Sequence, residues 1–372
     1  MAADTRDRLL AAAIILLSDN WYEIVSVAEI CRKASLSNGI FYKYFKDKEE
    51  LFAEINREFL RKFAHDLSVV GRYGDIEADL TDFISITVGI ARRYGREVSI
   101  FREGQYHYLD LEQNLRQLYM VSLARVFGRS LSEAEYLYAV SGIRFLATRG
   151  IYNAIDVDEP HLTRLILDGV FDGGSVSENP DPGPLEVSLD FGDQPASRIK
   201  LAEAGMTLFG ERNFYNVGVS EICLKAGLSV GTFYKQFGTK EAFLDYLVKV
   251  IGHSLRYFLK VNVRSDRDRL YREVLGMGFF ARYFMARPEF YSIVRQAEFV
   301  TETWVRDYYN RIEEGYRRNL NIDDPRQACT TANFLMGLSH YMGIELIFSD
   351  RVSDPAALLK TLGGYLKEGL KP

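Results

Sequence analysis

The sequence predicts an all-α protein made of two tandem modules, each a helix-turn-helix domain followed by a larger helical domain. Three observations support this fold class. Apolar residues recur at helical spacing over long stretches with almost no proline. The nine residues SNGIFYKYF, from Ser37 to Phe45, return as SVGTFYKQF from Ser229 to Phe237. Residues 172–195 between the two copies collect Gly, Pro, Asp and Ser, which is the composition of a flexible linker.

The duplication extends well beyond the two nonapeptides. The same offset of 192 residues (229 minus 37) aligns Leu9 with Leu201 and residues 29–52 with residues 221–244, without a gap. A long period of this kind indicates repeated structural units. We therefore expect helix-turn-helix domains at residues 1–50 and 196–243, helical domains at residues 51–171 and 244–372, and a linker at residues 172–195.

Composition excludes several classes of protein. The chain has 372 residues, of which 47% are hydrophobic, so it can bury more than one core. Its net charge of -5 gives no global attraction to nucleic acid, and any DNA contact must be local. Three cysteines without CxxC spacing and five scattered histidines predict neither a disulfide framework nor a metal site, which favours the cytoplasm. Cys31 and Cys223 occupy the same position of the two copies, as small buried side chains would.

Catalysis and membrane insertion are not expected either. The chain has no nucleophile elbow, phosphate-binding loop or acid-base pair, so we expect no enzyme and no cofactor. The apolar run at residues 9–17 is too short to span a bilayer. Its counterpart at residues 201–209 lies deep in the chain, so both runs are interpreted as core helices.

Helix starts are marked by capping residues. Ser26 with Glu29, and Asp47 with Glu50, have the spacing of capping boxes, and Ser37 stands where an N-cap belongs. Residues 185–191 alternate like a strand but have no partner strand, so an extended linker is expected there. The expected helices of the first half span residues 6–18, 27–34, 38–45, 48–67, 76–94, 98–109, 111–127, 132–154 and 160–171, and the second half repeats this order and ends with 325–349 and 355–370.

Two of these short helices, 27–34 and 38–45, are joined by a link of three residues, which predicts a helix-turn-helix whose second helix enters the major groove of DNA. Phe41 and Phe45 are expected in the core, which leaves Asn38 and Lys43 on the outside. Asn can bond base edges, whereas Lys and Tyr can reach phosphate. Burial of Tyr42 and its counterpart Tyr234 in the core remains an alternative.

The segments VSVAEICRKASLSNGIFYKYFKDKEELF and VGVSEICLKAGLSVGTFYKQFGTKEAFL resemble the DNA-binding segment of the TetR family of bacterial transcriptional regulators. The resemblance covers about fifty residues in each half. It departs at Ile40, where Thr is usual, and at Gln236, where His or Tyr is common, so the two copies are expected to prefer different sequences. The resemblance implies that the base-approaching residues are Ser37, Asn38, Gly39, Ile40, Lys43, Ser229, Val230, Gly231, Thr232 and Lys235, and that the phosphate-contacting residues are Tyr42, Tyr44, Lys48, Tyr234, Gln236 and Lys240.

The later part of each half is rich in aromatic residues, and the resemblance implies an apolar pocket there for a small effector. Ordinary helical core is the alternative for each aromatic residue, and a DNA-binding protein without an effector also stays open. The candidate lining residues are Phe101, Arg102, Tyr106, His107, Tyr119 and Arg144 in the first half, and Tyr291, Arg295, Phe299, Trp304, Tyr308, Phe334, His340 and Tyr341 in the second.

Members of this family usually carry one module per chain and dimerise through their last two helices. A chain with two modules is expected to form that pair within itself, with residues 132–154 and 160–171 packed on 325–349 and 355–370. A homodimer is the alternative. Because the two recognition segments differ, the double-stranded DNA operator should be an imperfect palindrome.

The sequence thus predicts a cytoplasmic transcriptional regulator, expected to be a repressor, that a small apolar or aromatic effector controls and that has no membrane partner. The alternative is an interaction protein or antagonist with the same fold, in which one or both helix-turn-helix modules no longer bind DNA.

Overall fold

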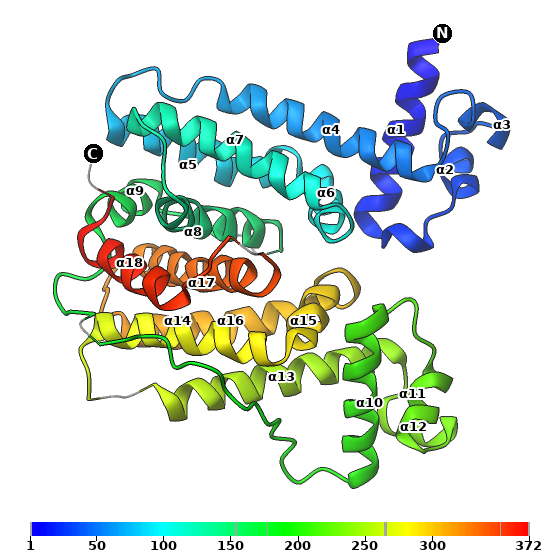
Figure 1. The fold of residues 1–372 in the computed structure, drawn as a ribbon. Coiled ribbons are helices and arrows are strands. Elements are labelled where there is room, and N and C mark those ends of the chain that lie inside the picture. Colours follow the sequence, from blue (N-terminus) through cyan, green and yellow to red (C-terminus); the bar gives the residue numbers. More distant parts are fainter. Residues whose placement is uncertain (1, 153–154, 177, 264–265, 350, 371–372) are drawn as a thin grey trace. The chain divides into compact units, whose positions relative to one another are not determined.

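The computed structural model describes residues 2–152, 155–176, 178–263, 266–349 and 351–370, and every regular element of these residues is helical, as predicted. The first half contains α1 (Ala2–Asp19), the 3-10 turn η1 (Tyr22–Ile24), α2 (Val27–Lys33), α3 (Asn38–Phe41), α4 (Lys48–Leu67), α5 (Ile76–Arg93), α6 (Gly95–His107), α7 (Leu109–Phe127), α8 (Glu133–Tyr152) and α9 (Glu159–Asp168). The second half contains α10 (Ala196–Arg212), α11 (Val219–Ala226), α12 (Val230–Phe237), α13 (Lys240–Asn262), α14 (Arg269–Ala286), α15 (Pro288–Val300), α16 (Glu302–Asn319), α17 (Pro325–Phe348) and α18 (Pro355–Glu368) (Figure 1).

The helices form two compact units. Unit 1 comprises residues 1–131 and 147–154, and unit 2 comprises residues 132–146 and 155–372. The start of α8 and all of α9 therefore belong to unit 2, although they precede the linker in the sequence. The boundaries of the two units therefore differ from the module boundaries expected from the repeat. The repeat follows the duplicated sequence, whereas the units follow the packing of the helices.

The two units repeat one packing scheme. In unit 1, α1 packs on α2 and α6, and α4 packs on α6 and α7. In unit 2, α10 packs on α11 and α15, and α13 packs on α15 and α16. Cys31 and Cys223 are buried in the matching cores, as expected. The duplicated sequence therefore folds into duplicated packing.

The two recognition segments differ in length. The first was predicted as a helix over residues 38–45, but α3 ends at Phe41, whereas α12 continues to Phe237. Gly238 ends α12 with a φ of 74°, a left-handed conformation that glycine adopts readily. The corresponding residue of the first copy is Lys46, for which that conformation is costly. The first segment instead closes with short turns, in which the N–H groups of Lys43 and Tyr44 bond the carbonyls three residues earlier.

The capping predictions hold in part. Ser26 and Glu29 form a reciprocal capping box, and Asp47 accepts a hydrogen bond from the N–H of Glu50 at 2.8 Å. The Glu50 carboxylate, however, accepts from the N–H of Lys46 rather than from that of Asp47. Ser37 occupies the N-cap position of α3 without a side-chain hydrogen bond to the helix.

The segment predicted as a flexible linker is extended but docked on unit 2. Val187, Leu189 and Phe191 alternate along it and pack against the core of that unit. Asp181 forms an ion pair with Arg282 of α14. The alternation noted in the sequence thus reflects one face of an extended segment lying on helices, which corrects the prediction of a flexible coil.

Within unit 2, α9 and the first part of α8 pack on α17 and α18. The Tyr138 hydroxyl of α8 donates to the Leu165 carbonyl of α9 at 2.7 Å, and the Tyr138 ring lies 5.4 Å from that of Phe334. His161 of α9 bonds the Thr331 hydroxyl of α17 through Nε2 at 2.8 Å. The predicted packing of the last helices of the two halves is therefore present in the structure.

Glycines allow α8 and α17 to approach closely. A Cβ atom built on Gly142 would lie 2.9 Å from the Cα atom of Phe334, and one built on Gly337 would lie 2.7 Å from the carbonyl oxygen of Ser141. Neither distance leaves room for a methyl group. The crossing of these helices therefore requires glycine from both halves of the chain.

Candidate nucleic-acid interface and ligand cavity

Each recognition segment buries two phenylalanines and exposes the residues between them. Phe41 and Phe45 lie in the core of unit 1, and Phe233 and Phe237 lie in that of unit 2. The chain segments between the phenylalanines turn outward, so that 61% of Tyr42 and 50% of Tyr234 is exposed. The alternative that these tyrosines belong to the core is therefore wrong.

Most of the other predicted DNA-binding residues lie on the same outward surfaces. A Cβ atom on Gly39 would meet no other atom within 4 Å, so packing inside the domain does not require glycine there. A glycine at this exposed position would instead allow the backbone of another molecule to approach closely. The exposed residues are Ser37, Asn38, Gly39 and Lys43 in the first copy and Ser229, Val230, Gly231 and Lys235 in the second, while Ile40 and Thr232 are half-buried.

Two outer residues also hold their segments in place. Tyr44 packs partly against the core of unit 1. Gln236 donates through Nε2 to the Ser197 hydroxyl at 2.8 Å, which ties α12 to α10. Any contact that these side chains make with DNA must be compatible with these packing roles.

Lys48 and Lys240 require a correction, because both turn toward their own domains instead of outward. The Lys48 ammonium donates to the carbonyls of Tyr22 and Val25 at 2.7 and 2.8 Å and lies 4.1 Å from the centre of the Tyr22 ring. Lys240 lies 4.1 Å from the ring centre of Phe214. Burial lowers the pKa of both lysines. They stabilise the turn that precedes each helix-turn-helix, so their ammonium groups are not placed to contact phosphate.

The turn of the helix-turn-helix needs a left-handed residue in both copies. Gly227 supplies it in unit 2 with a φ of 66°, whereas Ser35 adopts a φ of 54° in unit 1. For a residue with a Cβ atom this conformation costs about 1 kcal/mol. The Arg8 guanidinium donates to the neighbouring Ala34 carbonyl at 2.7 Å, which helps to hold the strained turn.

One side chain from the helical domain reaches the helix-turn-helix domain in each copy. Glu103 of α6 accepts a hydrogen bond from the N–H of Tyr22 at 2.6 Å, and Gln296 of α15 accepts one from the N–H of Phe214 at 2.7 Å. Glu103 is almost fully buried, and burial raises the pKa of its carboxyl to about 8. Sequence reasoning missed this contact. Its signal was a polar residue near the middle of each helical domain, although Glu103 and Gln296 are 193 residues apart and so fall one residue out of the register of the repeat.

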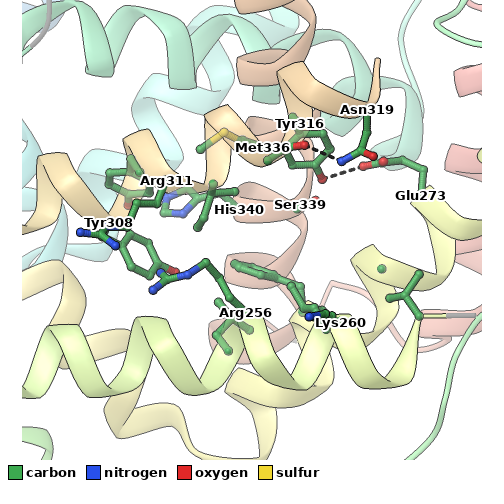
Figure 2. Close-up of a pocket in the computed structure, with 18 of the residues that line it drawn as sticks. Arg256, Lys260, Glu273, Tyr308, Arg311, Tyr316, Asn319, Met336, Ser339 and His340 are labelled. Carbon is green, nitrogen blue, oxygen red and sulfur yellow. Dashed lines mark hydrogen bonds between the residues drawn. The ribbon is translucent and has the colours of Figure 1, made fainter. Parts of the chain in front are cut away.

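Unit 2 contains a cavity of about 530 Å³ between α13, α14, α16 and α17, shown in Figure 2. This volume is within the range of small-molecule sites. Of the predicted candidates, Tyr291, Tyr308 and His340 line it, and the Tyr291 hydroxyl lies 3.2 Å from Nε2 of His340. The structure thus brings three of the predicted residues together.

Other candidates lie elsewhere. Phe334 packs in the helical bundle, and Arg144 stacks on Tyr341, with its guanidinium carbon 4.4 Å from the ring centre. Phe101 and Tyr119 are buried against aromatic neighbours in unit 1. None of these residues lines the cavity of unit 2, and their assignment to a pocket stays a prediction. Arg102, Arg295 and Phe299 are half-buried, and the last two do not line this cavity; the side chains of Tyr106, His107 and Trp304 are outside the described residues.

Sequence reasoning missed the charged part of the cavity lining. Arg256 and Lys260 stand one helical turn apart on α13, so they lie on the same face of that helix. Phe145, which comes from α8 of the first half, also lines the cavity. That contribution depends on long-range packing, which no local pattern reveals.

The described residues include neither a candidate membrane span nor a candidate metal site. No helix among them is long and apolar enough to cross a membrane. No group of three or more His, Cys, Asp or Glu side chains in the described ranges could hold a metal ion.

Two helix-turn-helix domains, each joined to a helical domain, define a tandem helix-turn-helix protein. Residues 9–55 and 201–247 both match the N-terminal domain of the bacterial regulatory proteins of the tetR family. The chain thus carries two N-terminal domains of the TetR type in tandem.

Individual relatives resemble parts of the chain. The HTH-type transcriptional regulator AcrR of Shigella flexneri is 39% identical over 54 residues, which are 14% of this chain and 25% of that protein. The chain therefore spans a quarter of the length of this relative. Among solved structures, the fatty acid degradation regulator FadR of Bacillus halodurans is 16% identical, with 48% of this chain and 98% of that chain covered and a TM-score of 0.40. A transcriptional regulator of Rhodococcus sp. Rha1 is 19% identical, with 47% and 100% covered and a TM-score of 0.40.

Proposed function

We propose that this protein is a DNA-binding transcriptional regulator that places two recognition segments of one chain on a pseudo-palindromic operator. The observation that carries the proposal is the repeated arrangement of a buried Phe pair with an exposed Tyr-Lys pair between its members. The Phe pair fixes the segment to its domain, and the exposed side chains can then meet phosphate and base edges without rearrangement. Tyr42 with Lys43, and Tyr234 with Lys235, are the proposed contacts.

Pairing of the two modules within one chain is supported by the bundle of α8, α9, α17 and α18. In a family that usually dimerises through these helices, the corresponding helices here are already packed on one another. The glycines of the α8–α17 crossing come from the two halves. The helix surfaces that would pair two chains are therefore already packed on each other within one chain. We infer that the active species in solution is a single chain of 42.6 kDa.

The two half-sites of the operator should differ. Exposed Asn38 of the first segment is replaced by exposed Val230 in the second. Asn can bond the edge of an adenine, whereas Val can only make apolar contact, for example with a thymine methyl group. The first half-site should therefore show the stronger preference for adenine.

An effector in the unit 2 cavity would regulate this binding. Only a ligand that binds one arrangement of the protein more tightly can shift the population toward that arrangement. If the cavity favours the arrangement that does not fit DNA, the effector releases the operator, and the protein acts as a repressor. Measurement of operator affinity with and without ligand shows whether the effector releases the operator or strengthens its binding.

Selection of bound fragments from random DNA, followed by a salt series, tests the proposal. We expect an imperfect palindrome, and we expect Lys43→Ala and Lys235→Ala each to reduce affinity and to lower the slope of log affinity against log salt by about 1. Lys249→Ala, at an exposed position of α13 outside the recognition segments, is the control and should leave both unchanged. Absence of any enriched sequence would contradict the proposal and favour an interaction protein that has lost DNA binding.

Light scattering at micromolar concentration tests the single-chain pairing separately. A mass of 42.6 kDa supports the pseudo-dimer. A mass near twice that value would show that pairing takes place between chains.

A further inference from the structure

We propose that the cavity of unit 2 binds an amphipathic organic anion, with its acidic group at Arg256 and Lys260 and its apolar body along the aromatic wall. This inference rests on the proposed function, because it assigns a chemical class to the effector. The resemblance of the chain to a family does not specify such a class. The charges and packing of the cavity do.

The cavity lining is strongly unbalanced in charge. Five cationic side chains line it against one carboxyl group, that of Glu273. A cavity that concentrates one sign of charge between low-dielectric walls attracts ligands of the opposite sign. The five cations are Arg256, Lys260, Arg269, Arg272 and Arg311.

The carboxyl group of Glu273 offsets little of this charge. Its oxygen accepts a hydrogen bond from the Tyr316 hydroxyl at 2.7 Å, and its other oxygen lies 3.7 Å from the guanidinium of Arg269. Burial raises the pKa of Glu273, which favours its neutral form. Glu273 is thus engaged with its neighbours, and Figure 2 shows it apart from Arg256 and Tyr308.

Arg256 is the best-placed cation for the acidic group. It is half-buried, and among the described residues no carboxylate lies within ion-pair distance of it. Arg311, in contrast, is paired with Asp307 at 2.8 Å. Burial is the main cause that lowers the pKa of Arg256, with Arg311 acting in the same direction and Tyr308 and Asp307 against it, so an anion in contact with Arg256 would offset the cost of burying its charge. Lys260, one turn further along α13, can approach the same anion as a second donor.

Two more guanidinium groups support an anionic ligand. Arg269 and Arg272 also line the cavity, and both add to the positive charge that an anion would meet there.

The other residues that line the cavity are mostly apolar, and they indicate that the rest of the ligand is apolar as well. Leu259, Phe280, Phe284, Val294 and Met336 surround the cavity with aliphatic and aromatic carbon. Burial of the CH₂ groups of a ligand there removes apolar surface from water and favours binding. A small inorganic anion would leave this surface unused, so the structure favours an acid with a long apolar body.

Phe145 extends the site across the helical bundle. It comes from α8 of the first half, yet its ring lies 5.4 Å from that of Tyr309 and 5.6 Å from that of His340, which belong to the second. A ligand that contacts Phe145 touches both halves of the bundle at once. Its binding free energy therefore depends on how α8 packs on α17, which is the property that an effector needs.

Three probes with one chain length and different head groups test the proposal: decanoate, 1-decanol and decylamine, each titrated calorimetrically into the full chain. We expect decanoate to bind at least tenfold more tightly than 1-decanol, and decylamine to bind more weakly than either. Arg256→Met keeps the apolar stem and removes the charge, so it should bring decanoate and 1-decanol to within twofold. Arg256→Lys should restore part of the preference.

Two control variants separate the head group from the body. Lys249→Met, on the same helix but outside the cavity lining, should leave the preference for decanoate unchanged. Phe145→Ala should weaken decanoate and 1-decanol by the same factor, because it removes contact with the body alone. Melting temperatures of all variants identify any that fail to fold.

Equal binding of decanoate and 1-decanol, tighter binding of decylamine, or absence of decanoate binding up to its solubility limit would overturn the proposal. So would an unchanged preference in folded Arg256→Met. These measurements contain no DNA. Their failure would leave the DNA-binding proposal standing, and failure to select an operator would leave the ligand assignment standing.

Discussion

Glu103 makes the stability of unit 1 depend on pH. Burial raises the pKa of its carboxyl from 4.5 to about 8, so the folded protein holds this proton more tightly than the unfolded chain does. The stabilising contribution is complete below pH 4.5 and is lost as the pH rises to about 8. The neighbouring charges of Glu23 and Lys48 act in opposite directions and do not reverse this sign.

We expect Glu103→Gln to remove this dependence. The amide oxygen can still accept from the N–H of Tyr22, as Gln296 does from that of Phe214, but it does not titrate. Denaturant unfolding between pH 5 and 8.5 should show stability falling with pH in the natural protein, by a few kcal/mol for a shift of this size, and a flatter profile in the variant. Gln296→Glu should create the same slope in unit 2. An identical slope in Glu103→Gln would refute this role.

The turn of the first helix-turn-helix carries strain that the second avoids. Ser35 adopts a φ of 54°, and its counterpart Gly227 a φ of 66°. Ser35→Gly should therefore raise the free energy of unfolding by about 0.5–1 kcal/mol, and Gly227→Ser should lower it by about 1 kcal/mol. Chemical unfolding of both variants measures this. A destabilised Ser35→Gly would mean that the turn is not strained.

At the level of elements, the caps of the two recognition helices differ although both N-cap residues are serine. The Ser229 hydroxyl accepts a hydrogen bond from the N–H of Thr232 at 3.2 Å, whereas Ser37 makes no such bond. We expect Ser229→Ala to cost about 1 kcal/mol of stability and Ser37→Ala only a few tenths. Thermal unfolding without DNA separates this effect from DNA binding. Equal losses would show that α3 is capped in solution as α12 is.

Elements were predictable from the sequence where local rules decide them. The capping box at Ser26 and the buried Phe pairs follow from spacing within a few residues, and the duplicated order of helices follows from the internal repeat. The length of α3 was not predicted. The second copy ends its recognition helix at Gly238 with a φ of 74°, whereas the first has Lys46 at the corresponding position and ends its helix at Phe41.

The candidate sites were predictable to a smaller extent. The exposed faces of the recognition segments follow from helical periodicity. The roles of Lys48 and Lys240 were misjudged, since nothing local indicates that their ammonium groups meet the turn at Tyr22 and the ring of Phe214. Phe145 and Glu103 were missed for the same reason, because each acts on a partner more than 80 residues away in the sequence.

For the whole molecule, the segment between the modules changes how the two halves are joined. A flexible tether would only raise their effective concentration. The docked segment does more, since the Asp190 N–H donates to the Ser254 hydroxyl at 3.1 Å and Asp181 pairs with Arg282. Residues 172–191 thus contribute an interface of their own, in addition to the bundle of α8, α9, α17 and α18.

A cut in the segment between the modules should therefore leave the halves associated. Gly192, Asp193 and Gln194 are exposed and lie beyond the last docked apolar side chain, Phe191, so a protease site inserted there avoids the packed residues. After complete cleavage, we expect the two fragments to elute together at micromolar concentration with the mass of the intact chain, 42.6 kDa. The uncut protein with the same insertion is the control for folding. Separation of the fragments at about half that mass would show that only the covalent connection holds the halves together. Neither the bundle nor the docked segment could then supply the pairing that a two-module DNA clamp requires.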